Sequence, residues 1–479
     1  MFFTCLVSLL LLVQAAPSGN QVIDLALQDM RAGKYGEARE MLQRALGDAP
    51  QNALLWSYLG EVNAKLQHTD AAIKAFQKAR SLTPQDPRVC FNLGVLYMQK
   101  KATAEALEMY RQGLALDSTD VAANQNYAFL LMQEGKYREA VAPLERLKRM
   151  SGADLSVRVA LIESLLKCGE EQRGHAELGE FLDLPSATVE DRMKLAKLLM
   201  QDHLRHAAQE TLESVLRSSP DLAEAHADLG LLFLQAGQFE EARLHAGRAV
   251  QLEPDSADYC MLLAQILLKE KQYPTALAIL EATKDRFGSL AVYQYKLAWA
   301  HYGLGHVPTA AALLETLVQQ HPRLDRAHYS LGDCYVALGK LQKAEAQYRA
   351  AIGLNPKDGS YHAALGLVLR KEHGGRIEEA IGELEKAQQL NRLDVESRVQ
   401  LAICYEQKTQ LSKAEQLLET AIQEQPSLEA AHRVLARVYY RQGKKELGDR
   451  ETEVISKLDS EETRRRARLI QSSPPESFQ

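Results

Sequence analysis

Apolar and polar side chains alternate with a helical period along nearly the whole chain. From residue 19 onward, apolar residues recur every three or four positions in segments of about 13 residues, and short turns separate the segments. Many of these turns carry a glycine, which tolerates the positive φ angle that closes a helix: Gly33, Gly135, Gly237, Gly305, Gly339 and Gly443. The pattern predicts an all-α protein made of short helices joined in hairpins.

The hairpins form a sequence repeat. A Leu-Gly pair recurs at intervals of 34 residues or multiples of 34, with its glycine at Gly60, Gly94, Gly230, Gly332 and Gly366. An alanine follows twelve residues later at Ala72, Ala106, Ala242 and Ala344, and fourteen residues later at Ala380. Prolines recur in a single phase, at Pro50, Pro84, Pro220, Pro254, Pro322, Pro356 and Pro426. Such a repeat predicts a stack of hairpins, because one hairpin cannot bury its apolar face alone.

The repeated positions resemble the tetratricopeptide repeat. The resemblance is carried by Trp56-Ser57-Tyr58-Leu59-Gly60 with Ala72, Phe76, Ala79 and Pro84, and by Leu331-Gly332 with Tyr335, Ala344 and Pro356. It extends from residue 19 to about residue 462, and it implies an α-solenoid, a right-handed superhelix of about thirteen hairpins. The hairpins are expected to begin at Gly19, Ala53, Pro87, Val121, Leu155, Val189, Ala223, Ala257, Ala291, Asp325, Gly359, Val395 and Glu429.

The repeat divides the chain into five expected segments. These are an export signal in 1–18, repeats one to four in 19–154, a degenerate repeat in 155–188, repeats six to thirteen in 189–462, and the end of a capping helix with a disordered tail in 463–479. In the degenerate repeat, Ile162 and Phe181 replace small residues, and Pro143 falls inside the preceding helix. This part of the chain is therefore the expected place for an irregular joint.

The N-terminal segment differs from the repeats. Met1–Ala16 carries no charged side chain, and it contains the apolar run Leu6–Val13. Val13-Gln14-Ala15 is a small-x-small cleavage pattern, so the segment predicts a secretory signal peptide and an exported protein, periplasmic or secreted. The alternative is an uncleaved membrane anchor, although the apolar run is short for a membrane span. Membrane contact is expected only through this segment.

Composition narrows the classes of partner. The net charge of −6 gives no reason to expect nucleic acid, whose readers usually carry a strong basic field. The cysteines that follow the export signal are too far apart in the repeat for disulfide bonds. All of them are expected to be buried as small apolar residues: Cys90, Cys168, Cys260, Cys334 and Cys404.

The sequence contains no motif typical of an enzyme or a metal site. His203 and His206 are three residues apart but fall in a hairpin turn, where solvated side chains are expected. Four histidines share the repeat phase of Trp56, which predicts packing between helices: His226, His328, His362 and His432. A basic cluster fits a solvated helix face, the alternative being contact with anionic lipid or an acidic partner: Arg464, Arg465, Arg466 and Arg468. We expect no catalysis, no metal and no cofactor.

The first helices of the hairpins offer a candidate binding surface. In the repeats that this chain resembles, these helices line the concave face, and here they carry apolar side chains where a surface helix is normally polar. The candidate partner-binding residues are Phe91, Val95, Met98, Phe129, Met132, Leu231, Leu234, Tyr295, Trp299, Tyr302 and Tyr329, with Met193, Met200, Met261 and Leu268 on the same stripe. Tyr295, Trp299 and Tyr302 form the densest aromatic group.

These features predict a scaffold that binds a peptide or helix of a partner protein along the concave face, in the assembly of an envelope or secreted complex. The Lys and Asn positions of the chaperone-tail clamp are occupied by residues such as Ser57, Glu61 and Phe91, so that binding mode is not expected. One alternative is a glycan-binding or enzyme-associated solenoid, because Tyr and Trp rings also stack on sugars. Another is a tight superhelix that buries part of the stripe against its own next turn.

Overall fold

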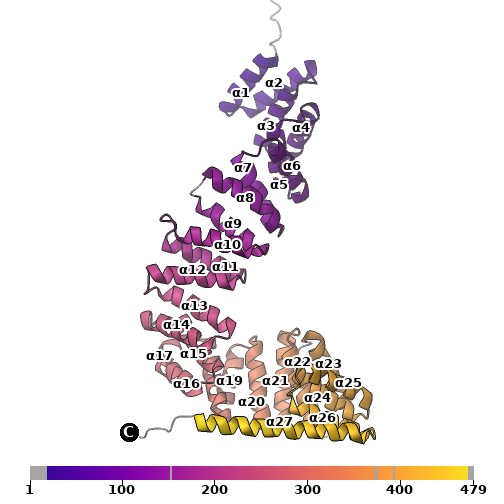
Figure 1. The fold of residues 1–479 in the computed structure, drawn as a ribbon. Helices are drawn as coiled ribbons and strands as arrows, with labels where there is room; N and C mark the ends of the chain where they lie inside the picture. The colour runs from indigo at the N-terminus through magenta and orange to yellow at the C-terminus, as the bar shows by residue number, and fades with distance from the viewer. Residues whose placement is uncertain (1–18, 152–153, 373–375, 392–393, 473–479) are drawn as a thin grey trace, which may run out of the picture. The chain divides into compact units, whose positions relative to one another are not determined.

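The computed structural model describes residues 19–151, 154–372, 376–391 and 394–472 (Figure 1). Of these, residues 19–21, 151 and 461–472 are described by their backbone alone. The predicted export signal and the end of the predicted tail lie outside the described residues. Within the described ranges the chain forms helices joined by short turns, and no strand occurs there. The prediction of an all-α solenoid of hairpins is confirmed.

The chain divides into two compact units, Met1–Asp221 and Leu222–Gln479. In the N-terminal unit the helices pair in sequence order. They are α1 (Gly19–Arg31), α2 (Tyr35–Asp48), α3 (Ala53–Lys65), α4 (Thr69–Leu82), α5 (Pro87–Gln99), α6 (Thr103–Leu116), α7 (Val121–Gln133), α8 (Tyr137–Ser151), α9 (Leu155–Lys167), α10 (Glu171–Leu182), α11 (Val189–Gln201) and α12 (Arg205–Ser218).

The C-terminal unit is built in the same way. Its helices are α13 (Ala223–Ala236), α14 (Phe239–Leu252), α15 (Ala257–Lys269), α16 (Tyr273–Ala282), α17 (Lys284–Phe287), α18 (Ala291–Gly303), α19 (Val307–Gln320), α20 (Asp325–Ala337), α21 (Leu341–Leu354), α22 (Gly359–Lys371), α23 (Ile377–Leu390), α24 (Val395–Gln407), α25 (Leu411–Glu424), α26 (Glu429–Arg441) and α27 (Lys445–Ser472). Helices α16 and α17 together take the place of one second helix, which is interrupted at Thr283.

Small residues let the two helices of a hairpin approach each other. The repeated alanines have no exposed surface: Ala72, Ala106, Ala242 and Ala344. A Cβ atom added at Gly332 would lie 2.4 Å from the ring of Tyr348, and one at Gly60 would lie 2.8 Å from the ring of Phe76. In each case the ring fills the space beside the glycine, which explains why a residue without a side chain recurs there.

In the hairpins whose turn the structure describes, the turn contains a residue with a positive φ angle. Glycine takes this conformation at Gly33, Gly135, Gly237, Gly305, Gly339 and Gly443, as predicted, and also at Gly169. The same conformation is adopted by Gln67, Lys101, His203, Lys271 and Thr409. Such residues lack the conformational freedom of glycine, so each of these turns is held at a cost of about 1 kcal/mol by the packing of its two helices.

The fourth residue of a first helix ties consecutive hairpins together. Trp56 donates a hydrogen bond from Nε1 to the carbonyl of Pro50, at 2.8 Å. His362 and His432 make the same bond from Nε2 to the proline carbonyl six residues earlier, at 3.1 Å and 2.9 Å. These two histidines are buried, as predicted, and each bond satisfies a carbonyl that lies in a turn, outside the helices.

Several predicted burial states need correction. Cys168 is only half-buried because it follows the end of α9, whereas the other four cysteines are buried. His226 and His328 are also only half-buried. In contrast, Met193, Met261 and Leu268 are buried and do not belong to an open stripe. The first helix of a repeat packs against several neighbours, so fewer of its positions remain exposed than one apolar face suggests.

The degenerate repeat corresponds to α9 and α10, inside the N-terminal unit, and the boundary between the units follows α12. Helix α8 continues through Pro143. The irregular joint predicted for 155–188 stays a prediction. The predicted basic cluster lies in the part of α27 whose side chains are not described. Among the described residues, no helix combines the length and the apolar character that crossing a membrane requires.

Candidate functional site

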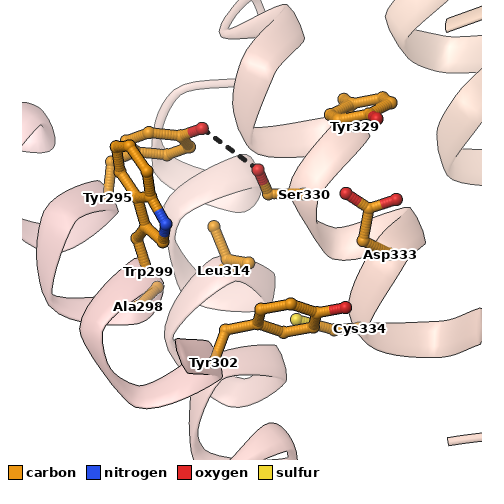
Figure 2. A pocket seen from close by; sticks show the side chains of 9 residues that line it. All are labelled: Tyr295, Ala298, Trp299, Tyr302, Leu314, Tyr329, Ser330, Asp333 and Cys334. Atoms are coloured by element: carbon orange, nitrogen blue, oxygen red, sulfur yellow. Dashed lines mark hydrogen bonds between the residues drawn. The ribbon is translucent and has the colours of Figure 1, made fainter. Parts of the chain in front are cut away.

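An aromatic pocket opens between the first helices of two consecutive hairpins in the C-terminal unit (Figure 2). It measures about 230 Å³, and its walls come from α18 and α20, with one residue from α19. We call it the aromatic pocket, defined by Tyr295, Ala298, Trp299, Tyr302, Leu314, Tyr329, Ser330, Asp333 and Cys334. Pockets for small molecules usually measure about 300–1,000 Å³, so this one suits a single amino-acid side chain.

One face of α18 supplies the main aromatic wall. Tyr295, Trp299 and Tyr302 follow each other at spacings of four and three residues, which places them on one side of a helix. The hydroxyl of Tyr295 lies 3.1 Å from Oγ of Ser330 on α20, the contact that the dashed line in Figure 2 marks. Tyr302 is 40% exposed, and Tyr295 and Trp299 are half-buried. The rings are therefore held in place and still reachable by a ligand.

A carboxylate faces these rings. Figure 2 shows Asp333 of α20 on the side of the pocket opposite to Tyr295 and Trp299. Tyr348 donates a hydrogen bond from its hydroxyl to Oδ1 of Asp333, at 2.6 Å. Burial raises the pKa of Asp333 to about 6, and the hydrogen bond from Tyr348 acts in the opposite direction. At neutral pH the carboxylate is mostly ionised and poorly solvated, which favours a cation beside it.

The remaining polar groups of the pocket are uncharged. The ring of Tyr329 lies between those of Tyr348 and Tyr361, with centroids 5.7 Å and 5.0 Å apart. Burial raises the pKa of Tyr329 and of Tyr348, so both phenols keep their protons. Burial also raises the pKa of the Cys334 thiol to about 12. A protonated thiol is a poor nucleophile, so the chemistry of the pocket favours binding over reaction.

A second cavity of about 730 Å³ adjoins the pocket and shares Tyr295, Trp299 and Tyr329 with it. We call it the basic groove, because it adds Lys269, Lys296 and Arg326; its other lining residues are Gln265, Ala291, Val292, Leu324, Asp358, Ser360 and Tyr361. The same three aromatic rings therefore border a pocket that contains one carboxylate and a groove that contains three basic residues and one acidic residue.

The buried cation of the basic groove is Lys296. It is 6% exposed, and its Nζ donates a hydrogen bond to Oε1 of Gln265 at 3.0 Å. Burial, with a smaller contribution from the charge of Arg326, lowers the pKa of Lys296 to about 8. Nζ of Lys269 lies 5.6 Å from the centre of the Trp299 ring, within the range of a cation–π contact. An anion bound in the groove would compensate the charge of Lys296.

The structure brings the sharpest predicted cluster together. Tyr295, Trp299, Tyr302 and Tyr329 line one pocket, with contributions from two repeats. The other predicted residues lie elsewhere. In the C-terminal unit, Leu231 and Leu234 are half-buried on α13.

The N-terminal unit carries the rest of the predicted stripe. Val95 and Phe129 are exposed, to 39% and 56%. Phe91 and Met98 are half-buried and pack against the core around Tyr110, and Met132 packs against the core of the next hairpin. These residues are distributed over α5 and α7.

Sequence reasoning missed the charged residues of the site. Asp333 lies four residues after Tyr329, and Lys296 lies directly after Tyr295. The helical spacing that predicted the aromatic residues could therefore have predicted these two charged residues as well. The prediction of the binding surface used apolar and aromatic positions only. A charged residue next to a predicted aromatic anchor was the signal that could have identified them.

Three family models match the chain. A model described as the cytochrome c-type biogenesis protein H TPR domain matches residues 24–157. Two models described as tetratricopeptide repeat match further along, one at 193–251, 295–359 and 335–395, the other at 233–300 and 374–438. The aromatic pocket lies within the matched segments, and none of them includes residues 158–192. No curated protein matches the chain.

Several solved structures are similar to the chain, at low sequence identity. The Naa15/Naa10 complex bound to HypK-THB is 14% identical, with a TM-score of 0.47, over 92% of this chain and 75% of that one. The APC/C Cut9–Hcn1 hetero-tetramer is 14% identical, with a TM-score of 0.45, over 92% and 87%. A thermophilic TPR protein of Thermus thermophilus is 23% identical, with a TM-score of 0.35, over 38% and 98%. These similarities carry no argument about function.

Proposed function

The protein is a tetratricopeptide-repeat protein, and we propose that it is a non-enzymatic scaffold that binds a partner protein through the aromatic pocket of its C-terminal unit. The observation that carries this proposal is the meeting of aromatic rings from two repeats around a space for one side chain. Aromatic residues dominate the few positions that supply most of the energy in protein interfaces. The partner would contribute one anchoring side chain, with the rest of its segment lying along the neighbouring first helices.

The anchoring side chain is basic. A cation over the face of Trp299 gains cation–π attraction, and a cation beside Asp333 gains a charge-assisted hydrogen bond. Arginine fits better than lysine, because its planar guanidinium stacks on a ring and pairs with a carboxylate at the same time.

An acidic residue next to the anchor would occupy the basic groove. Lys296 is buried, and its hydrogen-bond partner is the neutral amide of Gln265. A carboxylate of the partner segment beside Lys296 would form an ion pair that is shielded from water. The pocket and the groove share Tyr295, Trp299 and Tyr329, and neighbouring residues of one segment can reach both. The preferred partner segment therefore contains an arginine adjacent to an aspartate or glutamate.

The setting of this interaction is the assembly of an envelope or secreted complex. The N-terminal segment supports export, periplasmic or secreted, by its apolar run and cleavage pattern. The family model over residues 24–157 is described by a role in cytochrome c-type biogenesis. It supports an assembly role of that kind for the N-terminal unit.

Tryptophan fluorescence provides a direct test. The chain has two tryptophans, so Trp56→Phe leaves Trp299 as the only indole, in the pocket wall. Short Gly/Ser peptides with a central Arg-Glu, Gln-Glu or Arg-Gln pair are titrated into this variant. We expect the Arg-Glu peptide to change Trp299 emission at the lowest concentration. In the wild-type background, Trp299→Ala should weaken its binding by about 2 kcal/mol or more, roughly thirtyfold, measured by anisotropy of a labelled peptide.

Leu244→Ala is the matched control, because Leu244 is 71% exposed in the same unit and does not line the pocket. This variant should bind as the wild type does. Equal binding by Trp299→Ala would reject the pocket as the binding site, and equal binding of the Arg and Gln peptides would reject the basic anchor. If oligosaccharides change Trp299 emission and peptides do not, the glycan-binding alternative replaces this proposal.

A further inference from the structure

A cluster of metal-ligand side chains lies in the N-terminal unit, in other repeats than those that form the aromatic pocket. His175 comes from α10, and His206 and Glu210 come from α12. One potential ligand atom of each residue lies within 4.8 Å of those of the other two. Nδ1 of His175 is 2.9 Å from Oε2 of Glu210, and the rings of His175 and His206 have centroids 5.0 Å apart. Sequence reasoning placed His206 in a solvated turn and expected no metal.

The repeat explains why these residues meet. Helices α10 and α12 are the second helices of consecutive hairpins, and they contact each other. His206 and Glu210 are four residues apart on α12, so they share one face of that helix. His175 lies 31 residues before His206 and 35 residues before Glu210. Both separations are close to the repeat length, so His175 lies beside these two residues on the neighbouring second helix. A one-helix motif search cannot find such a site, because its residues belong to two repeats.

The cluster opens into a cavity of about 590 Å³ that could admit an ion and further ligands. His175 and His206 line it together with His203 and Glu171. Arg205 also lines it. All three cluster residues retain exposed surface, His206 the most, so they can adjust around an ion.

We propose that His175, His206 and Glu210 bind a divalent transition-metal ion, with Zn²⁺ as the best fit. Two imidazoles and one carboxylate are a common ligand set for zinc with one coordination position left open. Tetrahedral ligands about 2.1 Å from zinc lie about 3.4 Å from one another, so small side-chain rotations bring the three atoms from their present spacing into range. Imidazole ligands disfavour Ca²⁺ and Mg²⁺, which prefer oxygen.

The bound ion would join two repeats where the repeat pattern is weakest. His175 belongs to the degenerate repeat, and residues 158–192 lie outside the family matches. An ion held by ligands from α10 and α12 links these helices and stabilises the folded state by its binding free energy. The open coordination position faces the cavity, where a water molecule or a donor atom of a partner completes the shell.

The test uses the full chain without an affinity tag, because a histidine tag binds zinc itself. Isothermal titration of the chelator-treated protein with ZnCl₂ should give one site per chain. His175→Ala and His206→Ala should each lower the zinc affinity by about 100-fold or more. Mutation of residues that only support a metal ligand already lowers affinity by about 10–100-fold, and loss of a ligand itself should cost at least as much. Titration with Co²⁺ should give the visible spectrum of a four-coordinate ion.

His68→Ala is the matched control, since it removes an exposed imidazole of the same unit outside the cluster. It should leave zinc affinity unchanged, and circular dichroism should show that every variant is folded. The absence of a one-to-one site in the wild type, or the same affinity in folded His175→Ala and His206→Ala, would overturn the proposal. These variants should bind peptide at the aromatic pocket as the wild type does, because the pocket lies in the other unit. The zinc result and the proposed function are therefore tested independently.

Discussion

Histidine and glutamate meet in both units, but with different surroundings. In the C-terminal unit, His362 is 5% exposed, and its Nε2 donates to the carbonyl of Pro356 while its Nδ1 lies 2.6 Å from Glu383. In the N-terminal unit, His175 also contacts a glutamate, but the pair is partly exposed and stands beside His206. The first arrangement uses both ring nitrogens within the fold. The second leaves ligand atoms facing a cavity.

The comparison teaches that the residue types do not distinguish a structural histidine from a ligand. Both ring nitrogens of His362 are occupied by partners within the fold, a carbonyl and a carboxylate, so neither nitrogen faces open space where a metal could bind. Burial alone would raise the pKa of Glu383. Hydrogen bonds from Lys386 and His362 outweigh this effect and hold that pKa below its ordinary value. Burial and the number of partners therefore decide the role.

The largest expected difference concerns stability. His362→Ala removes the donor to the carbonyl of Pro356 and one of the two side-chain donors to the carboxylate of Glu383, which keeps Lys386. Each such loss costs about 1–3 kcal/mol. We expect a fall of about 3 kcal/mol in the free energy of unfolding, measured by urea denaturation followed by circular dichroism. His206→Ala, at an exposed position, should change it by about 0.5 kcal/mol or less. Equal effects of the two variants would remove the distinction between buried and open histidines.

Zinc should act on one unit only. At a free concentration 100 times the dissociation constant, a ligand that binds only the folded state stabilises it by about 2.7 kcal/mol. Hydrogen exchange followed by mass spectrometry should show slower exchange in α10 and α12 and no change in α22 and α23. The effect should vanish in His206→Ala. Protection that appears around His362 instead would reverse the assignment of the two histidine sites.

Acid should weaken both proposed cation sites, for different reasons. Protons compete with a metal for imidazole, whereas in the aromatic pocket they neutralise Asp333, whose pKa burial raises to about 6. Affinity for an Arg-Glu peptide should rise about tenfold between pH 5 and pH 7, because only the ionised carboxylate attracts the cation. The stability of the free protein depends on pH in the opposite direction. The raised pKa of Asp333 stabilises the folded state at low pH, and this contribution is lost as the pH rises from about 4 to 6.

Asp333→Asn is the control for the pocket. Its peptide affinity should be weak at every pH in this range, while its zinc affinity should keep the wild-type pH dependence. A peptide affinity that still follows pH in this variant would assign the titration to another group.

The smallest expected effect concerns the turn beside the cluster. His203 lines the same cavity as His175 and has a φ angle of 60°. His203→Gly should raise the free energy of unfolding by up to about 1 kcal/mol, because glycine adopts this conformation without steric cost. Calorimetry should find zinc affinity changed by no more than a few fold. A large loss would make His203 a fourth ligand and close the coordination position that we expect to be open.

Sequence alone predicted the fold because its signals repeat. The recurring glycines, alanines and prolines identified the hairpins, and the spacing of Tyr295, Trp299 and Tyr302 identified the richest wall of the pocket. The zinc cluster escaped notice because His175 is 31 residues from His206, and only their packing makes them neighbours. The burial of Met261 and Leu268 was missed for a related reason: a single helical period does not tell how many neighbours a helix has.

The bond from the fourth residue of a first helix to the proline carbonyl six residues earlier also bears on how such a chain evolves. If unequal recombination removed residues 325–358, the carbonyl of Pro322 would meet His362 in the place where it now meets His328. Glu383 would be carried along with His362, because the two belong to the same hairpin. The junctions at Trp56, His328, His362 and His432 share this bond. Duplication or deletion of whole repeats between such junctions therefore preserves this bond.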